Sequence, residues 1–215
     1  MLFKDKKVSV VIAHPDDETI GCGGLISKMV NCNCKVKVIL TLKSNSDRSL
    51  KNWQHYLKNF KSACKVLGAE PVIIKPLIYE HIADKHIWKI IKETKKYIEW
   101  ADLILTHNPG DLHYSHKFIS NIVEINTRPF RTHKNVLFFE IPTSTDQCYI
   151  PDFSPNLFVK LSESDITKKC NALECYKNEF SNERNPEYIK LHSKQRGSHI
   201  GEEYAEVFKI ARFFS

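Results

Sequence analysis

The sequence predicts an α/β protein whose mostly parallel sheet is covered by helices on both faces. Apolar, β-branched runs alternate with amphipathic stretches of helical period through about residue 140, and this alternation is typical of βαβ units. Several of the runs are apolar throughout, as in strands that are buried on both faces. Open sheets of this class bind ligands at the carboxyl ends of their strands, so we expect the active site there.

The first βαβ unit is predicted over residues 8–42. Residues 8–13 (VSVVIA) form a continuous apolar run, which predicts a buried strand. A helix is expected over 19–30, because Thr19 is a suitable N-cap and apolar residues recur on one helical face. Residues 35–42 (KVKVILTL) first alternate and then become apolar, which predicts the second strand.

The same pattern continues beyond a polar loop at residues 44–49. A helix is predicted over 50–67, and Gly68 ends it as the C′ residue, where glycine adopts a left-handed backbone at low cost. The remaining elements of the repeat are, in order, a strand at 72–74, a helix at 84–100, a strand at 102–106, a helix at 115–126 and a strand at 136–139.

The last third of the chain is richer in proline and in loops. Helices are predicted over about 163–180 and 186–194, and the final segment, 202–214, also has a helical pattern. We interpret this region as a loop-rich and helical extension, 141–215, of a single domain whose α/β core is 1–140.

Length and composition narrow the class of protein. A chain of 215 residues with 42% hydrophobic and 27% charged residues has the size and balance of one globular domain. No apolar run approaches the roughly 18 residues of a membrane-spanning helix. The first residues show no signal peptide, so the predicted location is the cytoplasm.

The net charge of +7 invites a nucleic-acid partner, but the type of cation argues against one. Lysine supplies 26 of the 32 cations and is scattered along the chain, whereas arginine dominates the recognition of bases and phosphates. We therefore expect no nucleic-acid partner. Seven cysteines without regular spacing predict reduced thiols rather than a disulfide framework. The sequence leaves self-association into a homo-oligomer open.

Two predicted strands are followed by loops rich in metal-ligand residues. The first loop is AHPDDE, residues 13–18, and the second is THNPGDLHYSH, residues 106–116. Taken alone, acidic residues before a helix are ordinary partners of its dipole, and a single loop histidine is more often a surface residue. Because both loops follow buried strands, their side chains are expected to meet and to form a His₂-carboxylate site.

The first loop continues into Gly21-Cys22-Gly23-Gly24, and AHPDDE with this glycine-rich helix start resembles the opening motif of the PIG-L/LmbE-like family of zinc-dependent N-deacetylases. The stretch HNPGDLHYSH resembles the family's second motif. Further similarity lies at 139–145, 153–156, 196–197 and 204–208, so the resemblance covers nearly the whole chain. It implies a Rossmann-like, three-layer α/β/α fold.

The resemblance also implies roles for individual residues. His14, Asp17 and His116 would be the metal ligands, with Zn²⁺ as the usual metal and another divalent ion possible. Asp16 would be the general base that acts on a metal-activated water. His113 would polarise the carbonyl or stabilise the oxyanion.

The implied reaction is removal of the N-acetyl group from an N-acetylated amino sugar that is free, nucleotide-linked or lipid-linked. Three residues are candidate substrate contacts: Arg48 on a loop, Asp111 on the second motif and Glu140 after the last predicted strand.

The chain departs from the family pattern near the expected substrate. Many members carry an acidic residue directly before the last metal histidine, where this chain has Ser115. The positions of a common Arg and Glu pair on the helix before Leu67-Gly68 hold Tyr56 and Asn59. These changes support an alternative function, in which the protein is a non-catalytic or altered-substrate relative that binds a sugar ligand.

Overall fold

The structure, a computed structural model, describes residues 3–150, 152–177 and 184–214, and of residues 47–51 it describes the backbone only. In the described chain, seven strands form one mixed sheet in the order β3-β2-β1-β4-β5-β7-β6. The strands are β1 (Lys7–Ile12), β2 (Lys35–Lys43), β3 (Glu70–Tyr79), β4 (Leu103–His107), β5 (Asn135–Phe139), β6 (Leu157–Lys160) and β7 (Ala205–Arg212). The first five are parallel, while β7 runs antiparallel to both β5 and β6.

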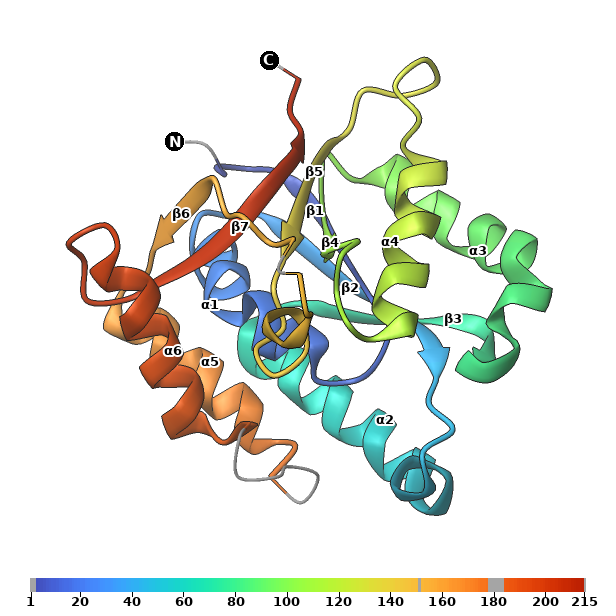
Figure 1. The fold of residues 1–215 in the computed structure, drawn as a ribbon, viewed down its shortest axis with the longest axis horizontal. Coiled ribbons are helices and arrows are strands. Elements are labelled where there is room, and N and C mark those ends of the chain that lie inside the picture. Colours follow the sequence, from blue (N-terminus) through green and yellow to red (C-terminus); the bar gives the residue numbers. More distant parts are fainter. Residues whose placement is uncertain (1–2, 151, 178–183, 215) are drawn as a thin grey trace.

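Helices cover both faces of this sheet (Figure 1). They are α1 (Asp17–Asn31), α2 (Asp47–Leu67), α3 (Ile87–Trp100), α4 (Tyr114–Asn126), α5 (Glu163–Glu174) and α6 (Pro186–Ser198). Helices α3 and α4, drawn in green, lie on one side of the sheet, and α1, α2, α5 and α6 lie on the other. The predicted three-layer α/β/α fold is therefore confirmed.

The central strand β1 shows why the sequence folds this way. Its side chains alternate between two cores: Val8, Val10 and Ile12 belong to the cluster under α1, α2, α5 and α6, and Val11 belongs to the cluster under α3 and α4. All four side chains have no exposed surface. A strand with apolar residues on both faces can be accommodated only between two layers, which explains the continuous apolar run.

The strand order places the two motif loops next to each other. Strands β1 and β4 are direct neighbours, with Val11 opposite Thr106, while β2 and β5 lie on opposite sides of this pair. The chain therefore winds away in two directions from the β1–β4 boundary. Such a switch point leaves a crevice at the carboxyl ends of the two strands, where ligands of this fold class bind.

One predicted element is wrong. Residues 202–214 were expected to be helical, but Ala205–Arg212 form strand β7, which pairs with β5 and β6. Pairing on both edges and burial of Tyr204, Val207 and Phe208 outweigh the local helical preference of this segment. Strand β6 was not predicted, because four residues between loops give too short a pattern.

Other elements differ in their ends. Strand β3 is longer than the predicted 72–74, and a short 3-10 helix, η1 (Glu80–His86), precedes α3. Helix α5 ends at Glu174, and the part of the predicted helix beyond residue 177 falls outside the described residues. Within the described chain, no helix is long and apolar enough to cross a membrane. All seven cysteines lie in the described ranges as free thiols.

Candidate metal and catalytic site

The loops after β1 and β4 are joined by a direct hydrogen bond. The backbone N–H of Ala13 donates to Nε2 of His107, the last residue of β4, over 3.1 Å. The first loop then leads into α1, whose first residue is Asp17, and the second leads into α4 through its N-cap residue, His113. Each motif thus runs from the carboxyl end of a strand to the amino end of a helix, where the dipole favours anionic groups.

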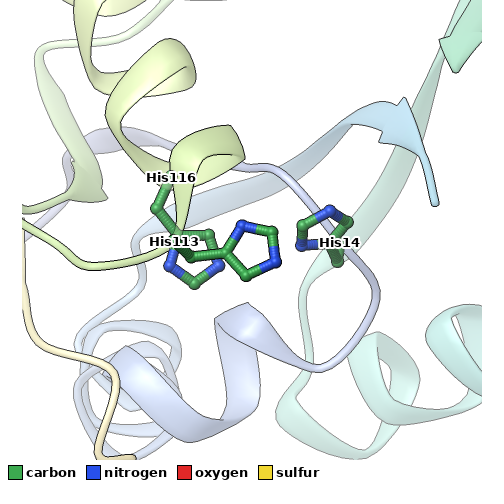
Figure 2. Close-up of side chains that lie close together, drawn as sticks. All are labelled: His14, His113 and His116. Carbon is green, nitrogen blue, oxygen red and sulfur yellow. The ribbon is translucent and has the colours of Figure 1, made fainter. Parts of the chain in front are cut away.

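Three imidazoles from these two loops face one another, as Figure 2 shows for His14, His113 and His116. The ring centres of His14 and His113 are 5.0 Å apart, those of His14 and His116 5.7 Å, and those of His113 and His116 4.7 Å. One potential ligand nitrogen from each ring lies within 4.8 Å of the others. The sequence separates His14 from His116 by about half the chain, and the sheet brings them together.

The Asp17 carboxylate lies between the histidines and is almost fully buried. Its Oδ1 is 3.3 Å from Nε2 of His116, and its Oδ2 is 3.8 Å from Nδ1 of His14. Burial alone would raise the pKa of Asp17, but the imidazoles of His116 and His107 hold it well below its usual range. Asp17 is therefore an anion at neutral pH, as a metal-ligating carboxylate must be.

The donors of His14, Asp17 and His116 approach the spacing of a tetrahedral metal site through different oxygens of Asp17. With Zn–N and Zn–O distances of about 2.0–2.1 Å, neighbouring ligand atoms of a tetrahedral site stand roughly 3.3 Å apart. Oδ1 of Asp17 stands at this distance from His116, whereas His14 lies 3.8 Å from the other oxygen, Oδ2, so the two contacts do not share one ligand atom. Among the described residues, two groups have donor atoms that all lie within 4.8 Å of one another: His14 with His113 and His116, and Asp17 with His107 and His116. Two imidazoles and one carboxylate leave a fourth position for water or substrate, as hydrolytic zinc sites do.

His107 is a second neighbour of Asp17, because its Nε2 lies 3.3 Å from Oδ2 of the carboxylate. With Asp17 and His116 it forms one of the two groups whose donor atoms lie within 4.8 Å of one another. However, Nε2 of His107 is the acceptor of the Ala13 amide, so its lone pair is already used. The ring is completely buried and stacks on His116 at 4.0 Å, and burial lowers its pKa to about 4. We interpret His107 as an uncharged side chain that packs against His116 and does not bind the metal.

Asp111 orients His116 from behind. Its Oδ1 lies 3.0 Å from Nδ1 of His116 and accepts hydrogen bonds from the backbone N–H of His113 and from Oγ of Ser144. The Thr145 hydroxyl donates to Oδ2. This carboxylate–imidazole contact directs Nε2 of His116 towards Asp17. Despite burial, the two aspartates raise the pKa of His116 to about 9.

Asp16 directly precedes Asp17, and its side chain pairs with Arg184 rather than with the histidines. It has a left-handed backbone, with φ of 99°, which few non-glycine residues adopt. Its side chain keeps 19% of its surface exposed. Burial and the adjacent Asp17 raise the pKa of Asp16 to about 7, although Arg184, 3.7 Å away, opposes the shift. A carboxylate with this pKa can accept and return a proton near neutral pH.

His113 is the most exposed of the three imidazoles. Its Nδ1 accepts the backbone N–H of Ser115 over 3.2 Å, which is the N-cap bond of α4. Partial burial and the neighbouring His116 and His14 lower the pKa of His113 to about 4. At neutral pH the ring is therefore neutral, with its proton on Nε2, and that N–H is available to a substrate oxygen.

Glu18, the last residue of the first motif loop, stabilises that loop through buried hydrogen bonds. Its carboxyl group accepts hydrogen bonds from the hydroxyls of Thr19, at 2.7 Å, and Tyr176, at 2.8 Å. The Asp16 backbone N–H also donates to it over 3.2 Å. Complete burial raises the pKa of Glu18 to about 8. These contacts fix the backbone turn that separates the directions of Asp16 and Asp17.

Two residues that sequence reasoning missed also reach this site. Glu80, the first residue of η1, contacts Nε2 of His14 at 2.8 Å. Arg184 donates from Nε to Oγ1 of Thr143 and pairs with Asp16. No local pattern around either residue signals a site, because both come from connecting segments whose position depends on the whole sheet.

The structure places the three expected substrate contacts in different surroundings. Asp111 is buried with both oxygens engaged as described above. Glu140 is also buried and forms a two-point ion pair with Arg196, at 2.8 and 2.5 Å. In this geometry neither carboxylate presents a free oxygen to a ligand. Arg48 lies in the first turn of α2, and its side chain is outside the described part of the structure.

Comparison with known families gives one match. The family model of PIG-L, described as GlcNAc-PI de-N-acetylase, matches residues 9–125, which include both motif loops. No curated protein sequence matches the chain.

Several solved structures share the fold over almost the entire chain. The A40926 pseudoaglycone deacetylase Dbv21 has 16% identity and a TM-score of 0.77, with 99% of this chain and 100% of Dbv21 covered. The 4-carboxy-2-hydroxymuconate hydratase GalB from Pseudomonas putida has 19% identity and a TM-score of 0.75, with 98% of each chain covered. The N,N'-diacetylchitobiose deacetylase from Pyrococcus horikoshii has 17% identity and a TM-score of 0.72, with 97% of this chain and 85% of that chain covered.

Proposed function

The chain belongs to the PIG-L family of de-N-acetylases, and on that premise we propose that it is a metal-dependent hydrolase that removes the N-acetyl group from an amino sugar. One observation supports this most strongly: His14, Asp16, Asp17, His113 and His116 gather at the switch point between β1 and β4. The two deacetylases with the same fold act on sugar-bearing compounds by their names, which agrees with such a substrate.

The proposed metal ligands are His14, Asp17 and His116. A zinc ion held by these groups would act as a Lewis acid and lower the pKa of a water molecule to near 7. Asp111 keeps His116 in the tautomer that exposes Nε2, because its carboxylate accepts the proton on Nδ1. The buried, anionic Asp17 would balance the positive charge of a bound metal.

Asp16 is the proposed general base and then the general acid. As a carboxylate it accepts a proton from the attacking water while the water oxygen bonds to the acetamide carbon. The protonated Asp16 then donates this proton to the sugar nitrogen as the C–N bond breaks. The products are acetate and a free amine. A pKa of about 7 suits both steps, because neither proton transfer is strongly uphill at neutral pH.

His113 is the proposed donor to the carbonyl oxygen. Its Nδ1 is held by the Ser115 amide, so the neutral ring directs Nε2–H away from α4. The negative charge that develops on the carbonyl oxygen strengthens this hydrogen bond in the transition state. Donors of this kind contribute about 3 to 4 kcal/mol to catalysis.

The proposal is tested by acetate release from N-acetylhexosamines that are free, nucleotide-linked or lipid-linked. The purified protein is assayed after removal of metal with a chelator and after addition of single divalent ions, including Zn²⁺. We expect release from at least one class only when metal is present. No release with any compound and any ion would refute the proposal.

Variants separate the enzyme from a relative that only binds sugar. Asp16→Asn should retain bound metal and lose turnover by a factor of about 10² to 10⁴, whereas His116→Ala should lose the metal itself. Full turnover in Asp16→Asn would refute the role of this residue. Stoichiometric metal and sugar binding without acetate release would instead support a binding protein, and water addition to a carbon–carbon double bond would point to chemistry like that named for GalB.

A further inference from the structure

Glu80 lies outside both sequence motifs and nevertheless reaches the proposed metal ligands. It begins η1 directly after β3, at the edge of the sheet. Its side chain extends under the site and keeps only 16% of its surface exposed. An acidic side chain in this position has to be balanced by donors or by positive charge, since burial of an unpaired carboxylate is costly.

Four donors face the two oxygens of Glu80. Oε2 lies 2.8 Å from Nε2 of His14 and 2.7 Å from Oγ of Ser115. Oε1 accepts the backbone N–H of Asn45 at 3.0 Å and the hydroxyl of Ser44 at 3.1 Å. The carboxylate thus connects the loops after β1 and β2 and the first turn of α4 with the end of β3.

We propose that Glu80 is a positioning residue of the metal site: its carboxylate accepts the Nε2 proton of His14 and thereby presents Nδ1 of that ring to the metal. This inference rests on the proposed function, in which His14 is a ligand. Ser115, the residue directly before His116, links the same carboxylate to the second imidazole ligand through its hydroxyl.

The geometry distinguishes positioning from direct ligation. A carboxylate can only accept, so Nε2 of His14 carries a proton in this contact and Nδ1 keeps its lone pair. Nδ1 is the nitrogen that lies 3.8 Å from Asp17. Carboxylates that hold the second nitrogen of a ligating imidazole commonly fix its tautomer and raise its basicity.

Glu80→Gln tests the proposal with little change in shape. The Asn45 N–H requires an oxygen acceptor, so the amide group of glutamine turns its NH₂ towards His14. The ring would then have to accept at Nε2 and move its proton to Nδ1, which removes the lone pair from the metal. We expect zinc affinity, measured by competition with a coloured chelator, to fall about 10- to 100-fold. Wild-type affinity in this variant would overturn the proposal.

A control makes the result specific. Glu70→Gln removes an exposed carboxylate that pairs only with Lys37 among the contacts described, and it should bind zinc within about threefold of the wild type. A comparable loss of zinc affinity in Glu70→Gln would contradict the assignment to His14. Melting temperatures measured in chelator show whether each variant is folded.

A measurement on the wild type avoids variants altogether. Long-range ¹H–¹⁵N spectra of the zinc-loaded protein should show His14 protonated at Nε2 and unprotonated at Nδ1, and the opposite tautomer would overturn the proposal even if Glu80→Gln fails to fold. A wild type that binds no divalent ion and releases no acetate would instead refute the proposed function. A wild type that binds zinc and releases acetate, together with an unaffected Glu80→Gln variant, would refute only the role of Glu80.

Discussion

The ion pair between Arg184 and Asp16 should set the pH at which the enzyme becomes active. Arg184 opposes the rise of the Asp16 pKa, and its Nη1 lies 3.7 Å from Oδ2 of the carboxylate. The general base works as a carboxylate. Replacement of Arg184 by glutamine should therefore raise the pKa of Asp16 and move the acidic limb of the rate profile to higher pH.

The size of this shift follows from the distance and the exposure of the pair. The side chains of Arg184 and Asp16 keep only 29% and 19% of their surfaces exposed, so the dielectric between them is below that of water, and the value for water gives the minimum interaction. In water, two unit charges at this distance interact by about 1.1 kcal/mol, so the pKa of Asp16 should rise by at least about 0.8 of a unit. Well below the midpoint of the wild type, the rate should therefore fall at least about sixfold, with no change on the alkaline plateau.

The assay measures kcat/KM for acetate release as a function of pH, from about 5.5 to about 9, which covers both sides of the expected midpoint. A bound divalent ion lowers the pKa of Asp16 in both proteins, so the difference between them remains the readout. Arg131→Gln provides the control, because this exposed arginine follows the far end of α4. An unchanged midpoint in Arg184→Gln, or a uniform loss at every pH, would refute the electrostatic argument.

Three further predictions concern the support of the site and the pH dependence of stability. Asp111→Asn should weaken zinc binding about 10- to 100-fold by loss of the anionic partner of His116, which equilibrium dialysis measures; unchanged affinity would contradict the orienting role. Glu206→Gln should lower the free energy of unfolding by about 3 kcal/mol or more, because it leaves the buried Lys169 ammonium without its anion at 2.7 Å; urea titration should show this loss, and a change below about 1 kcal/mol would contradict it. Burial and nearby cations lower the pKa of His192 to about 3. Between about pH 3 and 6.5, His192 is therefore protonated in the unfolded state but not in the folded state. Over this range the free energy of unfolding falls by up to about 1.4 kcal/mol for each unit by which the pH decreases. His192→Gln should therefore lose less stability than the wild type over this pH range, and parallel unfolding curves would refute the assignment.

The fold class could be predicted because β1, β2 and β4 are apolar on both faces, and such strands need two covering layers. The C-terminal strand could not be predicted in the same way. The residues of β7 take their conformation from pairing with β5 and β6, which are 45 or more positions distant in the sequence. Local preference contains no information about such partners.

Some residues of the candidate site could be predicted from the sequence, and others could not. The two motifs identified His14, Asp17 and His116 as expected ligands, because histidine and carboxylate next to strand ends are chemically informative residue types. Glu80 and Arg184 could not be predicted as site residues, because each belongs to a segment with no recognisable pattern. They reach the site only because β3 and the segment before α6 end near it.

The sequence by itself thus determined the layered fold, the family and the set of reactive groups, since these follow from local periodicity and from short motifs. The tertiary structure alone decided how those groups differ from one another. It buried Asp17 between imidazoles and left Asp16 partly exposed beside Arg184, so two adjacent aspartates acquired opposite pKa shifts. It also turned Asp111 and Glu140, which the sequence offered as substrate contacts, into buried partners of His116 and Arg196. The physical reason is that burial, charge and hydrogen-bond partners are properties of position in space, and chain-distant segments supply them.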